Sequence, residues 1–181
     1  MPELPVETAL LSRRGALKIG LCATTFLAVA GLGASLSGCS ASTNARGFEV
    51  LRSADLDFLQ ALIPVMLAGS IAHVALPSAT DATLHQLDSN LAHLSPELLK
   101  LTLQLFDVLA MPVTRGPLTG IWGSWEDASP ENIQHFLQRW QNSSFNLLRM
   151  GHGSLMQLVM MSSYEQPELW AHCGYPGPPK I

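Results

Sequence analysis

The sequence has few cysteines and none of the arrangements by which proteins usually hold redox groups. Its three cysteines, Cys22, Cys39 and Cys173, form neither a Cys-x-x-Cys-His haem-attachment motif nor a quartet for an iron–sulfur cluster. A nucleophile elbow is also lacking, and the segment 151–154 (Gly-His-Gly-Ser) does not complete a dinucleotide-binding loop, because Met156 stands where its third glycine belongs. The sequence therefore predicts neither catalytic residues nor a cofactor held by this chain.

Clusters of basic residues are absent after residue 38, where lysines and arginines are single and scattered. Such a distribution cannot neutralise a row of phosphates, so nucleic acid is not an expected partner. Asp81, His85 and Asp88 share one helical face and could hold a metal ion, but we favour a solvated helix face for them. We therefore predict no metal site.

No stretch alternates apolar and polar residues for long enough to predict a strand. Apolar residues instead recur at helical spacing in about five segments. These are expected to begin at Ser53, with Pro64 kinking or ending the first, at the Ser78–Asp81 capping box, at Ser95-Pro96-Glu97, at Ser129-Pro130-Glu131 and near Phe145. We predict an all-α fold, a compact bundle of about five helices.

The third predicted helix is apolar on most of its circumference, so it is either central or has a face reserved for another protein. Residues 112–128 after it are rich in proline and glycine and predict a long irregular loop. Its Trp122 and Trp125 are expected to dock either in the core or on a partner. The Pro/Gly-rich residues 174–179 predict an extended C-terminal tail.

Residues 1–39 have the features of an export signal. An arginine pair precedes an uncharged stretch rich in Gly, Ala and Leu from Ile19 to Gly38. The pattern resembles the twin-arginine (Tat) signal, with Ala16 in place of the preferred Phe, and matches it at Ser12, Arg13, Arg14, Leu17 and Lys18. A retained membrane anchor is the alternative, although the stretch is only mildly hydrophobic. Because the Tat translocase carries folded proteins, the resemblance implies assembly before export.

The segment 36–39 (Leu-Ser-Gly-Cys) resembles a lipobox, so Cys39 is expected to be lipidated and to anchor the protein on the periplasmic side of a bacterial membrane. Cleavage near Ala41 or Ala45, which would release a soluble periplasmic protein, is the alternative. Residues 40–50 begin with small polar residues and are predicted to be a tether, followed by a single helical domain over 51–181.

Removal of residues 1–38 takes three basic and two acidic residues from the chain and moves the formal net charge from −4 to −5. Cys22 leaves with the signal and Cys39 is expected to be acylated, so Cys173 has no partner for an internal disulfide. We favour a buried, inert thiol for Cys173. A bridge to a partner or a cofactor contact is the alternative.

Residues 130–179 carry a set of motifs with a recognisable order. These are Trp140-Gln-Asn-Ser143, Arg149, Tyr164, the turn Pro167-Glu168-Leu169-Trp170 and the terminal Gly174-Tyr175-Pro176-Gly177-Pro178. Together they resemble the C-terminal part of the gluconate 2-dehydrogenase subunit 3 family, whose members are small Tat-exported partners of periplasmic flavin dehydrogenases. The chain departs from the family pattern in its lipobox and in Ser163-Tyr164, where many relatives have paired aromatics.

This resemblance implies a non-catalytic accessory subunit that carries a flavoprotein dehydrogenase of the glucose-methanol-choline (GMC) type through the Tat translocase and stays bound to it. FAD would belong to the partner. The third helix, the tryptophan loop and the tail are the expected partner surface, with Trp122, Trp125, Trp140, Trp170, Tyr175, Pro176 and Gly177 as candidates. A stand-alone exported lipoprotein with a structural or binding role is the alternative, and a small enzyme is the least favoured reading.

Overall fold

The computed structural model describes residues 43–72, 75–167, 170 and 174–177 of the chain. The export signal, Cys39 and Cys173 lie outside the described residues. Residues from Thr43 onward form one compact unit. It contains the helices α2 (Ser53–Met66), α3 (Leu76–Ala92), α4 (Pro96–Ala110), α5 (Pro112–Thr119), α6 (Pro130–Gln141) and α7 (Asn146–Tyr164).

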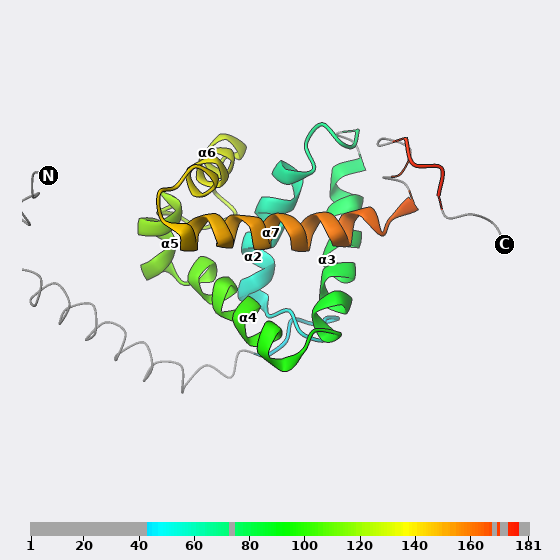
Figure 1. Ribbon diagram of the computed structural model, residues 1–181, viewed down its shortest axis with the longest axis horizontal. Helices are drawn as coiled ribbons and strands as arrows, with labels where there is room; N and C mark the ends of the chain where they lie inside the picture. Colours follow the sequence, from blue (N-terminus) through cyan, green and yellow to red (C-terminus); the bar gives the residue numbers. More distant parts are fainter. Residues whose placement is uncertain (1–42, 73–74, 168–169, 171–173, 178–181) are drawn as a thin grey trace, which may run out of the picture. The chain divides into compact units, whose positions relative to one another are not determined.

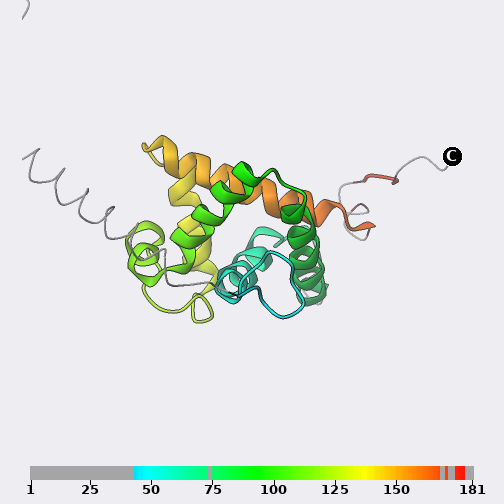
Figure 2. The ribbon, with the colours of Figure 1, turned by 90° about the horizontal axis from the view of Figure 1, so that it is seen from below.

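The described residues contain helices and two isolated β-bridges but no strand, so the prediction of an all-α bundle is confirmed. Helix α2 lies in the middle of the unit, where it packs against α3, α4, α6 and α7. Helix α7 runs across the bundle and packs on α3 near one end and on α6 near the other (Figure 1). Helices α3, α4 and α7 enclose a triangle in this view, and Figure 2 shows the same helices from below.

Two of the predicted serine caps form where the sequence places them. The Ser95 hydroxyl accepts the backbone N–H of Leu98 at the start of α4, and Ser129 accepts that of Asn132 at the start of α6. Each serine is followed by proline, whose missing N–H would have no helical partner in the first turn. The sequence signal works because both interactions are local.

Helices α2 and α7 also begin as predicted, at Ser53 and just after Phe145. The predicted cap of α2 and the predicted start of α3 were wrong, because nearby contacts replace the expected ones. Residue 52 rather than Ser53 caps α2, with the Arg52 backbone N–H donating to Asp55. Helix α3 starts at Leu76, and Ser78 lies inside its first turn, where its hydroxyl donates to the Ala75 carbonyl. Pro64 lies inside α2, which continues to Met66.

The predicted loop over 112–128 is also wrong for its first half, which forms α5. Pro112 takes the first helical position, where proline is tolerated. Gly120 then ends the helix with a φ of +83°, a left-handed conformation that glycine adopts without a steric penalty. The breakers of this segment therefore define the two ends of a short helix.

The centre of the unit holds a row of five buried aromatic side chains, which we call the aromatic row. Ring centroids lie 5.2 Å apart for Phe106 and Phe58, 6.1 Å for Phe58 and Trp125, 6.1 Å for Trp125 and Phe136, and 5.0 Å for Phe136 and Trp140. Three of these four pairs meet edge to face, a favoured arrangement for aromatic rings. The row joins α4, α2, the loop after α5, and α6.

One helix meets the end of this row through a glycine. A Cβ atom added at Gly151 of α7 would lie 2.8 Å from the Trp140 ring and 3.5 Å from Leu105 of α4. At Gly153, on the same helix, an added Cβ would meet nothing within 4 Å. The Gly-His-Gly-Ser segment therefore contains one glycine that the packing requires and one that it does not.

We predict opposite effects for two matched substitutions in α7. Gly151→Ala should lower the free energy of unfolding by about 1–3 kcal/mol, because the methyl group overlaps the Trp140 ring. Gly153→Ala should raise it by about 0.5–1 kcal/mol, because alanine restricts the unfolded chain without a clash. Urea denaturation measures both. Equal effects at the two positions would contradict the packing described for Gly151.

The segment before α2 is bound to α3 by the Asp88 carboxylate and by stacking of Phe48 on His85. Asp88 accepts the backbone N–H groups of Glu49 at 2.7 Å, of Val50 at 2.9 Å and of Leu51 at 2.8 Å. Only 7% of Asp88 is exposed, so the prediction of a solvated face is wrong for this residue. Ala45 is buried as well. Much of the predicted 40–50 tether therefore belongs to the helical unit.

Removing the Asp88 carboxylate should loosen the segment before α2 without unfolding the bundle. Asp88→Ala leaves three backbone donors without their acceptor, which should cost about 1–3 kcal/mol of stability. Hydrogen exchange should accelerate at residues 49–51 and stay unchanged in α6. Asp81→Ala, which removes an exposed acid from the same helix, is the control and should change stability by less than about 0.5 kcal/mol. Unchanged exchange at residues 49–51 would disprove the anchoring role.

Candidate docking groove

Much of the apolar surface of the unit is left open on its helices. Large apolar side chains with about half or more of their area exposed occur on α4, at the start of α5, in the loop after it, along α7 and in the C-terminal tail. They are Leu98, Leu101, Met111, Val113, Trp122, Phe145, Leu147, Met150, Met161, Tyr164 and Tyr175. Exposed apolar surface of this extent usually marks a binding site.

A groove lies between α4 and α7, and the C-terminal end of α3 closes one end of it. The two helices approach each other at Leu105 and Gly151, where Leu105 would contact a Cβ at 3.5 Å. They then diverge towards the start of α4 and the end of α7, and the end of α3 lies between them (Figure 1). The resulting cavity has a volume of about 430 Å³. We call it the α4–α7 groove.

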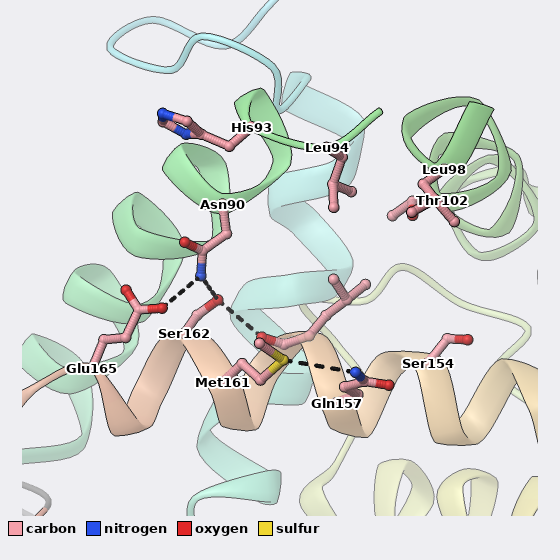
Figure 3. A pocket seen from close by; sticks show the side chains of 11 residues that line it. Asn90, His93, Leu94, Leu98, Thr102, Ser154, Gln157, Met161, Ser162 and Glu165 are labelled. Atoms are coloured by element: carbon pink, nitrogen blue, oxygen red, sulfur yellow. Dashed lines mark hydrogen bonds between the residues drawn. The ribbon is translucent and has the colours of Figure 1, made fainter. Parts of the chain in front are cut away.

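The walls of the groove are mostly apolar. Leu94 comes from the turn after α3, Leu98 from the first turn of α4, and Leu158 and Met161 from α7. Figure 3 shows Leu94 and Leu98 reaching towards the α7 side chains across the opening. An apolar side chain entering here would be covered from three helices.

One end of the groove is polar and built as a hydrogen-bonded set. The Asn90 amide donates to the Ser162 hydroxyl at 3.1 Å and to the Glu165 carboxylate at 3.3 Å (Figure 3). The Ser162 hydroxyl in turn donates to the Leu158 carbonyl at 2.9 Å. Beneath this set, Thr83 and Ser163 are hydrogen-bonded in a buried contact between α3 and α7. These bonds hold α7 against α3 and leave the Glu165 side chain exposed at the groove mouth.

Sequence reasoning only partly identified these residues. The apolar circumference of the third helix indicated either a central helix or a face for a partner, and the structure exposes Leu98 and Leu101 on one side while burying Phe106 and Leu109 on the other. The contribution of α7 was missed. Its exposed methionines alternate with buried residues, which looks like an ordinary core-facing stripe in the sequence.

Two of the predicted partner residues, Trp125 and Trp140, are instead core residues, each only 2% exposed. Their indole N–H groups donate to the Leu109 and Leu118 carbonyls, both at 2.9 Å. Those carbonyls belong to the last turns of α4 and α5, where the helix provides no backbone N–H donor for them. Both rings thus fill the core and satisfy a helix end, and neither is accessible to another protein.

Trp122 differs from its neighbour Trp125 because 77% of it is exposed. Its ring lies over Gly116 of α5, where an added Cβ would come within 2.6 Å of it. The ring is therefore placed against the surface by one face and open on the other. Of the two tryptophans in this loop, Trp122 is the one available to a partner.

The described part of the C-terminal tail folds around Trp170. The Trp170 indole donates to the Tyr164 carbonyl at 2.7 Å, and the Tyr175 backbone N–H donates to the Trp170 carbonyl at 3.0 Å. The Trp170 and Tyr175 rings meet edge to face at 5.4 Å, and Gly177, with a φ of +92°, lies against Trp170. Pro176 is exposed. These residues therefore form a compact turn that presents Tyr175 at the surface.

Among the titratable groups of the described residues, Arg52 and His152 have shifted pKa values. Hydrogen bonds to Asp55 raise the pKa of Arg52, an effect that its partial burial opposes and Asp107 reinforces. Burial lowers the pKa of His152. Across residues 43–72, 75–167, 170 and 174–177, no group of three His, Cys, Asp or Glu side chains could hold a metal ion. In the same ranges no helix is both long and apolar enough to span a membrane.

Comparisons with family models, with curated proteins and with solved structures found no match to this chain. The residues and geometry described above therefore carry the functional argument.

The two loop tryptophans should respond differently to truncation. Trp125→Ala should lower the free energy of unfolding by about 3–5 kcal/mol, because it opens a cavity in the aromatic row and frees the Leu109 carbonyl. Trp122→Ala should change it by less than about 1 kcal/mol, since most of that ring is already in solvent. Thermal and urea unfolding measure both. A similar loss for both variants would show that Trp122 is also a core residue.

Proposed function

We propose that this protein is a non-catalytic accessory subunit that carries a flavin-dependent dehydrogenase of the GMC type through the twin-arginine translocase and remains bound to it in the periplasm. The observation that carries the proposal is the open apolar surface of α4 and α7, together with the arginine pair in an export-signal pattern. FAD belongs to the partner. Lipidated Cys39 holds the complex at the membrane.

The exposed surface supports the binding part of this proposal. Leu98 and Leu101 are more than half exposed. For an exported protein in water, such exposed leucines bring no benefit unless the surface of another molecule covers them. A partner that covers them before export removes that apolar area from water at roughly 25 cal/mol per Å². An accessory subunit has a reason to keep such a face, because its function is to stay bound.

The anchoring of the N-terminal segment supports the carrier part of the proposal. The carboxylate of Asp88 and the buried Ala45 fix the chain to the bundle just after the predicted signal and lipidation site. A pull on the signal is therefore transmitted to the folded unit close to its point of attachment. This suits a protein that is moved while folded and with a second chain bound to it.

Replacing Arg13-Arg14 by Lys-Lys should leave both this chain and its flavoprotein partner in the cytoplasm. The substitution keeps the charge and removes the guanidinium groups that the resemblance to the Tat signal implies are recognised. Cell fractionation with immunoblots for this chain, and FAD fluorescence of the protein purified with it, measures the distribution. Arg46→Lys, an exposed arginine outside the signal, is the control. A flavoprotein that still reaches the periplasm would refute the carrier function.

A further inference from the structure

The α4–α7 groove differs from the other exposed apolar surface because it combines depth with a fixed charge. Its mouth carries Glu165, which caps the C-terminal end of α7. A carboxylate there faces the negative end of the helix dipole, which is unfavourable. Among the described residues, the one hydrogen bond to this side chain comes from the neutral amide of Asn90. Neither a lysine nor an arginine of the described residues forms an ion pair with it.

A second acid lies next to a groove residue in the sequence. Glu97 precedes the groove residue Leu98 on α4, is exposed, and forms no ion pair with any described residue. Of the eleven residues that line the groove, Glu165 is the one acid, and none is a lysine or an arginine. The groove is thus an apolar trough with a negative mouth, and the group that complements it is a cation beside an apolar surface.

The extent of the apolar surface favours a macromolecule over a small ligand. Leu101, on the next turn of α4 from Leu98, is 62% exposed and does not line the cavity. A small molecule that filled the cavity would leave this leucine in water, whereas a protein segment lying along the groove would cover it. No strand edge is available in the described unit for backbone pairing, so the segment must be recognised through its side chains.

We infer that the α4–α7 groove receives an amphipathic helix of the flavoprotein partner, whose apolar face enters between α4 and α7 and whose lysine or arginine pairs with Glu165. This inference rests on the proposed function and specifies where the two chains meet. A helix bound in a groove places its apolar anchors at i, i+3 or i+4, and i+7. This spacing matches the three-residue step between Leu98 and Leu101 on α4. The cation fixes the direction in which the helix lies.

Photo-crosslinking in the native cell tests the location. A benzophenone amino acid is placed at Met161 in the groove and, as a control, at the exposed Gln134 of α6. Peptide mass spectrometry then identifies the crosslinked chain and residue. We expect Met161 to crosslink to a helical segment of a flavoprotein that carries a lysine or arginine near the crosslink, and Gln134 not to do so.

The other outcomes separate the inference from the proposed function. Crosslinks to the flavoprotein from Gln134 but not from Met161 would overturn the groove assignment and leave the accessory function standing. Crosslinks from Met161 to a second copy of this chain, or to a lipid or small molecule, would also overturn the assignment. If no flavoprotein crosslinks from Met161 or Gln134, and none copurifies with this chain, the proposed function itself is refuted.

The charge is tested on the purified complex. Glu165→Lys should weaken binding of the flavoprotein about tenfold and Glu165→Gln less, because reversal places two like charges together. Glu126→Lys makes the same charge change in the loop after α5 and should leave affinity within about twofold.

The apolar anchor has its own matched pair. Met161→Ala should weaken the complex about tenfold, and Val113→Ala, at a more exposed position outside the groove, should not. Surface plasmon resonance measures all five variants, with circular dichroism to verify folding. Equal losses for Met161→Ala and Val113→Ala, or for the two lysine variants, would overturn the inference.

Discussion

The fold depends on the aromatic row, because its five rings join α4, α2, the loop after α5 and α6 in one continuous set of contacts. Phe58 on the central helix touches both α4 and the loop tryptophan, and Trp140 at the far end carries α7 on its ring through Gly151. Edge-to-face contacts fix orientation as well as distance. The indoles of Trp125 and Trp140 add direction, since each donates to the open end of a different helix. Core packing and helix termination are therefore achieved by the same side chains.

Buried acids serve a similar purpose where the chain enters the bundle. Asp55 is fully buried and accepts hydrogen bonds from the backbone N–H and the guanidinium of Arg52. The same guanidinium forms an ion pair with Asp107 of α4 at 2.7 Å. Asp88 holds the preceding segment by three amides. A buried charge is tolerated only where such partners replace water. These contacts orient the chain near the predicted lipidation site with respect to α2 and α3.

The groove follows from this arrangement. Gly151 lets α7 approach Trp140 and Leu105 closely at one point, while the polar contact of Asn90 with Ser162 holds the other half of α7 against α3. Helix α4 diverges from α7, so the leucines near the start of α4 remain exposed. The same contacts that make the bundle stable thus create a preformed apolar trough, and a partner that fills it need not order the site first.

The sequence by itself determined the helical class, the starts of α4 and α6 and the export pattern, because each depends on neighbours within a few residues. It also showed that the third helix is too apolar for a simple surface helix. Only the tertiary structure decided which tryptophans are core, that Asp88 is buried, and that α7 completes the groove with α4. Those properties come from contacts between residues far apart in the chain, such as Leu51 with Asp88 or Asn90 with Ser162, which local periodicity does not record.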